Sequence, residues 1–222
     1  MKTRSNKGRI QAFNSLELLV VLVAMAVLAA MLLPALSAAK RKNARINCVN
    51  NLHEITTAFR VWEGDNGDKY PMTMILTNNE TMRLVGNGNA YLLWQTMSNE
   101  LGTPKVLHCP ADIKRVQATS FATGFGDANI SYFLNPDASE NFPNMIMDGD
   151  RNLTLDGVPV KPGIVTVSST NSLGWTDEIH GRVSNISMAD GSVQQMTTAG
   201  LDAAAVNATN GTSVSTFRLV IP

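Results

Sequence analysis

Four residues near the C-terminal end could form an acid/base or metal-binding group. His180 follows Asp177 and Glu178 closely, and Asp190 stands ten residues further along the chain. An imidazole beside carboxylates is typical of such groups. The chain has neither the nucleophile motif G-x-S-x-G nor the zinc motif H-E-x-x-H. We therefore expect a structural role for His180, capping a loop by hydrogen bonds, and a protein that is not an enzyme. Metal or ligand binding by His180 is the alternative.

Two other places could bind metal ions. His108 stands next to Cys109, but the chain lacks the paired Cys-x-x-Cys spacing of a zinc site, so no metal site is predicted there. Asp65 and Asp68 lie in a Gly-rich stretch, where they could ligate calcium. Turn chemistry accounts for them equally well. The sequence therefore predicts no cofactor, with calcium as the alternative.

The N-terminal segment must position the rest of the chain. Sixteen apolar residues begin at Leu18, directly after Glu17, and no charge occurs from Leu18 to Ala39. A helix of about 20 such residues spans roughly 30 Å, the thickness of the bilayer core, so a transmembrane helix is predicted over about residues 16–38. Cations precede it without any acid: Lys2, Arg4, Lys7 and Arg9. A basic flank stays in the cytoplasm, so the remaining chain should lie outside it.

Glu17 is unusual at the mouth of a membrane span, where an unpaired carboxylate is costly. One interpretation is a charge at the interface, solvated by lipid headgroups. The other is that the chain is cut before Phe13, which would create a new amine four residues before Glu17. A secretory signal is cut after its apolar region. A cut before Phe13 would leave the apolar helix in the mature protein.

These residues resemble the prepilins of the type IV pilin and type II secretion pseudopilin family. Such prepilins have a basic leader, a small residue, a Phe, a Glu four residues later and an apolar helix. Ala12, Phe13 and Glu17 match this pattern, and Pro34 falls where the family's helices commonly carry a proline. Ala12 replaces the usual Gly, and Asn14-Ser15 replaces the usual Thr-Leu. The resemblance implies that prepilin peptidase cleaves after Ala12 and methylates the Phe13 amine.

Three further landmarks resemble a subgroup of pseudopilin-like proteins that end in an H-x9-D-G pattern. The pattern is present as His180 followed by Asp190-Gly191. The subgroup's Cys-x-Asn-Asn-Leu and Cys-Pro-x-Asp stretches correspond to residues 48–52 and 109–112. The resemblance implies a subunit of a type II secretion pseudopilus. The implied partners are other pilin-like subunits, prepilin peptidase, the inner-membrane assembly platform and membrane lipid.

The expected fold is α+β and pilin-like, with a long N-terminal helix, its first half transmembrane, packed on an antiparallel β-sheet. We expect a leader over 1–12, the helix over 13–66 and an extracytoplasmic domain over 67–222. Without the leader the chain carries 14 cations and 18 acids. This mildly acidic balance argues against nucleic-acid binding.

Periodicity places the elements of the globular part. Five residues recur every three or four positions and form one apolar helix face: Cys48, Leu52, Ile55, Phe59 and Trp62. A short helix over 90–97 and an extended piece over 106–112 follow. Asp190-Gly191 predicts a hairpin between 183–188 and 192–196. Other expected strands are 130–134, 144–148, 152–155, 158–160, 164–167, 172–176 and 213–221, with a helical turn and loop over 198–211.

Cys48 and Cys109 are the two cysteines of the chain, and the predicted orientation places both outside the cytoplasm, where disulfides persist. Cys48 begins the apolar face of the helix, and Cys109 must pack nearby. A bridge between them would tie the helix to the sheet, with a stabilisation on the order of 4 kcal/mol. Two buried free thiols are the alternative.

The function predicted from the sequence is filament assembly. The chain would be a single-pass protein of the inner membrane, with its N-terminus cytoplasmic, that assembles into a pseudopilus for protein export. Two alternatives stay open. One is a type IV pilus subunit for adhesion, motility or DNA uptake. The other is a membrane-tethered hydrolase or ligand-binding domain that uses His180, although a plain anchor has no need of Glu17.

Overall fold

The computed structural model describes residues 14–75, 83, 85–210 and 215–222. Ala12 and Phe13, the predicted cleavage site, lie outside the described residues. The chain divides into two compact units, Met1–Lys42 and Asn43–Pro222. The second unit includes the second half of the long helix, because that half contributes a buried face to the core of the unit.

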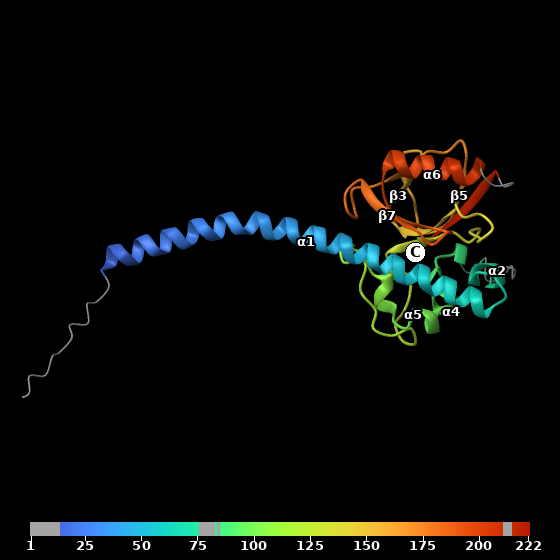
Figure 1. Cartoon of the computed structure of the whole chain (residues 1–222), viewed down its shortest axis with the longest axis horizontal. Coiled ribbons are helices and arrows are strands. Elements are labelled where there is room, and N and C mark those ends of the chain that lie inside the picture. Colours follow the sequence, from blue (N-terminus) through green and yellow to red (C-terminus); the bar gives the residue numbers. More distant parts are fainter. Residues whose placement is uncertain (1–13, 76–82, 84, 211–214) are drawn as a thin grey trace, which may run out of the picture. The chain divides into compact units, whose positions relative to one another are not determined.

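Helix α1 runs from Ser15 to Asp65 (Figure 1). Its N-terminal part makes up nearly all of the described residues of the first unit. The helix begins and ends within two residues of the predicted limits. Pro34 lies inside α1, and the helix continues through it, although proline has no backbone amide to donate a hydrogen bond. Large apolar side chains between Leu16 and Leu36 are exposed in the single chain. By length and composition α1 can cross a membrane.

The second unit is built from short helices and antiparallel strands. Its helical elements after α1 are α2 (Pro71–Ile75), α4 (Tyr91–Thr96), α5 (Ser98–Leu101), η1 (Pro104–Leu107), η2 (Asp127–Asn129) and α6 (Thr198–Asn210). Its strands are β1 (Tyr132–Leu134), β2 (Ile146–Asp150), β3 (Leu153–Leu155), β4 (Val158–Pro159), β5 (Gly163–Ser168), β6 (Leu173–Trp175), β7 (Val183–Met188), β8 (Val193–Thr197) and β9 (Thr216–Ile221).

The strands form two sheets. Six strands follow the order β5-β9-β1-β2-β7-β8, and three follow the order β4-β3-β6. Every pairing is antiparallel. The hairpin predicted at Asp190-Gly191 is the β7–β8 pair, in which Val183 faces Thr197. Strands β1 and β2 lie in the centre of the six-stranded sheet, so their side chains are buried on both faces.

The C-terminal half of α1 packs on one side of the large sheet, and α6 lies on the other side (Figure 1). Four residues of the predicted apolar face are fully buried: Cys48, Leu52, Ile55 and Phe59. Trp62, the fifth, is partly buried against the same core. The α+β, pilin-like fold expected from the sequence is therefore confirmed.

Two local predictions are wrong. An extended piece was expected over 106–112, but its first residues belong to η1. Pro104 begins this 3-10 helix, and the side chain of its N-cap residue, Thr103, accepts a hydrogen bond from the Lys105 amide. The segment after β8 is a full helix, α6, rather than a turn and loop. Buried Leu201 and the buried alanines of α6, among them Ala205, form the packed face that stabilises this helix.

Candidate functional site

The landmark residues of the H-x9-D-G pattern hold the C-terminal half of α1. Arg45, near the start of this half, donates from Nη2 to the His180 carbonyl oxygen at 2.5 Å. Arg60, about four turns further along, donates to the carbonyl oxygen of Asp190. Gly191 has φ +90°, and a Cβ built there would come within 2.7 Å of the Arg60 guanidinium. The left-handed φ favours glycine at this position, whereas the contact is with the end of a flexible side chain that could move aside.

The other landmark on α1 also binds the sheet. Asn51 Nδ2 donates to the His108 carbonyl oxygen at 2.9 Å and to the Tyr132 hydroxyl at 3.2 Å. The Tyr132 hydroxyl in turn donates to the Cys48 sulfur at 3.3 Å. The Cys-x-Asn-Asn-Leu stretch is thus a docking segment, which joins α1 to the loop before Cys109 and to strand β1.

A partly buried ion network fixes the loop that carries Cys109. Arg151 follows β2 and binds both carboxylate oxygens of Asp112 at 2.7 Å, in a bidentate pair. Arg151 also pairs with Glu178, which accepts from Lys114 at 3.2 Å. The last residue of the Cys-Pro-x-Asp stretch therefore links the Cys109 loop to the segment that leads into His180.

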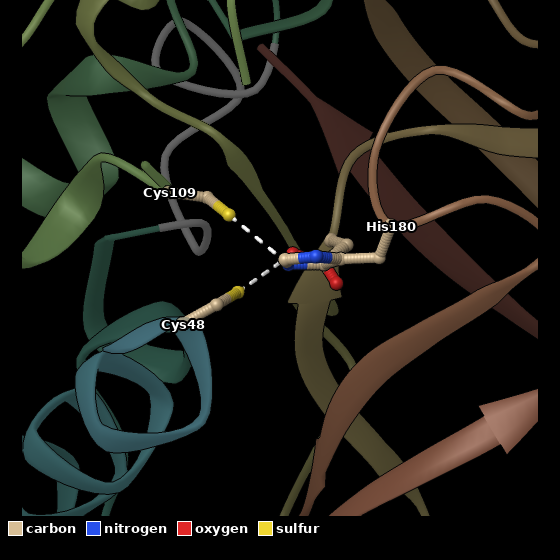
Figure 2. Close-up of side chains that lie close together, drawn as sticks. Cys48, Cys109 and His180 are labelled. Carbon is tan, nitrogen blue, oxygen red and sulfur yellow. Dashed lines mark hydrogen bonds between the residues drawn. The ribbon is translucent and has the colours of Figure 1, made fainter. Parts of the chain in front are cut away.

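Four potential metal ligands meet between α1 and the sheet; we call Cys48, Cys109, Asp150 and His180 the junction cluster. Their ligand atoms all lie within 4.8 Å of one another. Figure 2 shows Cys48 and Cys109 pointing from two sides toward the His180 ring. The Cys109 sulfur lies 3.2 Å from His180 Nε2, and the Cys48 thiol donates to Asp150 Oδ1 at 3.0 Å. Both cysteines and Asp150 are fully buried, and His180 is half-buried.

Strand pairing, further hydrogen bonds and backbone conformation orient the side chains of the junction cluster toward one another. Tyr132 and Asp150 are directly opposed in the β1–β2 pair, so both side chains lie on the face toward α1. Asp150 Oδ2 accepts from the Asn185 amide at 2.8 Å and from Asn185 Nδ2 at 3.1 Å, which leaves Oδ1 directed at Cys48. His180 has a left-handed backbone, with φ +57°. This conformation is costly for a residue with a side chain.

Burial sets the protonation states of the junction cluster. Desolvation raises the pKa of the Cys48 thiol well above its usual value, and a hydrogen bond to Cys109 and the charge of Asp150 add to the rise. Desolvation also raises the pKa of Asp150 to about 6, against hydrogen bonds from Cys48 and Asn185 that lower it. The pKa of His180 falls to about 4, through desolvation and the nearby charge of Arg45. His180 is therefore neutral at pH 7.

The predicted Cys48–Cys109 disulfide is not formed in this structure, where both residues are free thiols. The two sulfur atoms lie within 4.8 Å of each other. Each sulfur has a partner of another kind: Asp150 and Tyr132 for Cys48, and His180 for Cys109.

The other candidate groups lie apart from the junction cluster. Among the described residues, this cluster is the one group of three or more His, Cys, Asp or Glu that could bind a metal ion. The His108 ring contacts the Arg115 carbonyl oxygen at 3.2 Å, away from its sequence neighbour Cys109. Asp177 pairs with Arg182 at the surface. Asp190 Oδ1 accepts from the Ser192 amide at 2.8 Å, as expected of a turn residue.

The calcium candidates occupy the turn at the end of α1. The Asn66 and Asp68 amides both donate to the Glu63 carbonyl oxygen at 3.1 Å, and Asp68 has φ +57°. Asp65 is the last residue of the helix. Backbone turn geometry accounts for the position of both aspartates.

The position of Asp150 could not have been predicted from a motif. It lies inside β2 between other buried residues, and no Cys-x-x-Cys or His-x-x-x-His spacing points to it. The only signal in the sequence is the alternation of side chains along the strand, which places Asp148 and Asp150 on the same face of the sheet.

Comparisons of this chain with family models, with curated proteins and with solved structures find no match. The architecture is pilin-like in its long N-terminal helix and the antiparallel sheet on which the second half of that helix packs.

Glu17 lies in the first turn of α1, in the unit that ends at Lys42. Its Oε2 accepts a hydrogen bond from the Asn14 amide at 3.0 Å. The Asn14 carbonyl oxygen accepts from the Leu18 amide, so Asn14 stands at the N-cap position. Glu17 thus forms half of a capping box within the single chain.

Proposed function

We propose that this chain is a pilin-like subunit that prepilin peptidase processes and that assembles through its N-terminal helix into a type II secretion pseudopilus. The observation that carries the proposal is α1 itself. One helix has an exposed first half, uncharged from Leu18 to Ala39, and a second half whose apolar face is buried in a globular unit. A secretory signal that is removed has no reason to continue into the core helix of the domain.

The contacts of the landmark residues favour a structural role for them over a catalytic one. His180, Asp190 and Gly191 contact arginines of α1, and Asn51 and Asp112 hold segments against one another. These contacts are structural. A domain tethered for hydrolysis would instead need a nucleophile or base at an accessible cleft. We therefore propose that the residues of the H-x9-D-G pattern hold the strands of the globular unit against helix α1.

Glu17 provides the test of assembly. In a membrane its charge costs free energy unless it has a partner, and the amine of Phe13 in an adjacent subunit would be such a partner after cleavage. Glu17→Val should still insert and still be cleaved, but should enter filaments at less than about a tenth of the wild-type amount. Sheared-filament yield, measured by immunoblot against total cellular protein, gives this ratio.

Two further variants separate charge pairing from helix capping. Glu17→Gln keeps an oxygen that can accept from the Asn14 amide but has no charge, so it should assemble as poorly as Glu17→Val. Glu54→Gln, an exposed site on the same helix, should assemble like the wild type. Wild-type assembly of Glu17→Gln would show that capping alone is needed, and wild-type assembly of Glu17→Val would contradict the proposal.

The choice between a pseudopilus and a type IV pilus depends on neighbours. Affinity purification of the tagged chain from membranes should recover the assembly platform and ATPase of a secretion system. Recovery of pilus retraction components instead would favour the type IV pilus.

A further inference from the structure

The junction cluster has the composition of a metal site. Two thiols, one imidazole and one carboxylate converge from four separate segments: α1, the loop after η1, strand β2 and the loop before β7. Thiolate and imidazole are ligands that favour zinc among the divalent ions, structural zinc sites have four ligands, and a carboxylate oxygen can also bind zinc. The only two cysteines of the chain both belong to the cluster.

The spacing of the cluster fits a tetrahedral ion. With bonds of about 2.0 to 2.3 Å, ligand atoms around zinc are separated by roughly 3.3 to 3.8 Å. Two of the contacts in the cluster are 3.0 and 3.2 Å long, and no two ligand atoms are more than 4.8 Å apart. Side-chain movements of less than about 1 Å would place all four atoms at zinc-binding distance.

The surroundings of the cluster resemble the outer shell of a metal site. A ligating carboxylate is normally oriented by hydrogen bonds to its other oxygen, and Asn185 makes two such bonds to Asp150. The left-handed backbone of His180 is a local cost that places its ring against Cys109. Arg45, bound to the His180 carbonyl, supplies a positive charge beside a site that holds three potential anions.

The geometry points to a structural zinc site at the junction cluster, which ties helix α1 to the sheet through one Zn²⁺. Both cysteines would bind as thiolates, and their two protons would pass to solvent as the ion enters. His180 would bind through Nε2, and Asp150 through Oδ1. The ion would then do what a disulfide was expected to do, joining the helix to the domain. This inference does not depend on the proposed role in filament assembly.

The test measures zinc and cobalt binding by the full chain in detergent micelles. The protein is reduced with a phosphine, stripped with a chelator and dialysed against Zn²⁺ or Co²⁺. We expect one zinc per chain by mass spectrometry of the metal. Cobalt should give the visible bands of a tetrahedral site and a thiolate charge-transfer band.

Variants of three ligands should each weaken zinc binding by more than about tenfold: Cys109→Ser, Asp150→Asn and His180→Gln. His53→Gln, exposed on α1, and His108→Gln, whose ring contacts Arg115, are matched controls and should bind zinc like the wild type. Zinc should also raise the Tm of the wild-type chain and leave that of Cys109→Ser unchanged, which tests the site even where a variant is unstable.

Two results would overturn the inference. One is a reduced wild-type chain that binds no zinc and whose Tm is insensitive to it. The other is zinc binding by His180→Gln and Asp150→Asn equal to that of the controls, which would leave only an adventitious thiol site.

Discussion

The Asp148→Asn variant should be more stable than the wild-type protein at pH 8 and should lose this advantage at pH 4. Asp148 lies in central strand β2 and is fully buried. Its two carboxylate oxygens accept no hydrogen bond of normal geometry from the described part of the chain. Desolvation raises the pKa of Asp148 to about 7; the Ser187 hydroxyl on the paired strand lowers it, and the charge of Asp150 raises it further.

The direction of the effect follows from proton binding. Between pH 4 and pH 7 the unfolded chain has lost the Asp148 proton while the folded protein keeps it, so the folded state binds more protons and stability falls as pH rises. The shift from 3.8 to about 7 corresponds to roughly 4 kcal/mol of unfolding free energy, present below pH 4 and lost by pH 8. Asparagine does not titrate, so this loss should be absent from the variant.

Urea unfolding followed by tryptophan fluorescence at several pH values measures the effect in the full chain. The wild-type profile includes other groups. The depressed pKa of His180 acts in the opposite direction, because its stability contribution is lost as pH falls below about 6.5 toward 4. The difference between wild type and Asp148→Asn isolates Asp148. Asp177→Asn, at the surface, is the control and should follow the wild-type profile. Parallel profiles for wild type and Asp148→Asn would show that Asp148 titrates normally.

Gly149→Ala should destabilise the globular unit by on the order of 3 kcal/mol. Gly149 lies between Asp148 and Asp150, so a side chain at this position would point to the face of the sheet opposite to those carboxylates. A Cβ there would be 2.8 Å from both the Asn185 carbonyl oxygen and Ile186 Cγ2. The carbonyl belongs to the backbone of β7, so the strand itself must move. The paired carboxylates and the junction cluster would move with it.

Gly64→Ala is the matched control for this substitution. Gly64 lies in the last turn of α1, and apart from the adjacent backbone of the helix nothing lies within 4 Å of the position that an alanine methyl would take. Alanine has a higher helix propensity than glycine, so this variant should be as stable as the wild type or more stable by up to about 1 kcal/mol. Equal urea midpoints for Gly149→Ala and wild type would contradict the close packing of β2 against β7.

The sequence predicted the parts of the fold that depend on local chemistry. The apolar period of α1, the Asp190-Gly191 turn and the alternating runs around it each follow from short-range rules, and the structure has all three. The start of β1 and both limits of β2 lie two residues after the predicted ones, because hydrophobicity marks the core and not the end of a hydrogen-bonded ladder.

The candidate site was only half predictable. Cys48 and Cys109 could be brought together by reasoning from the buried helix face, but the partners of their sulfurs could not. Asp150 is a charged residue inside a central strand, which a hydrophobic pattern does not predict. His180 was expected in a loop, and its carbonyl does bind Arg45. That its ring would meet a cysteine depends on long-range packing, which no spacing along the chain encodes.

The central claim is that the leader is removed before Phe13 and that the mature protein retains helix α1. The mass of the N-terminal peptide of the mature protein tests this claim most directly. The chain, expressed with a prepilin peptidase and purified from membranes, should yield an N-terminal peptide that begins with N-methylated Phe13. Phe13→Ala and Ala12→Leu variants provide controls for cleavage at this bond. A membrane protein that begins at Met1, or a soluble protein cut beyond Ala39, would contradict the account.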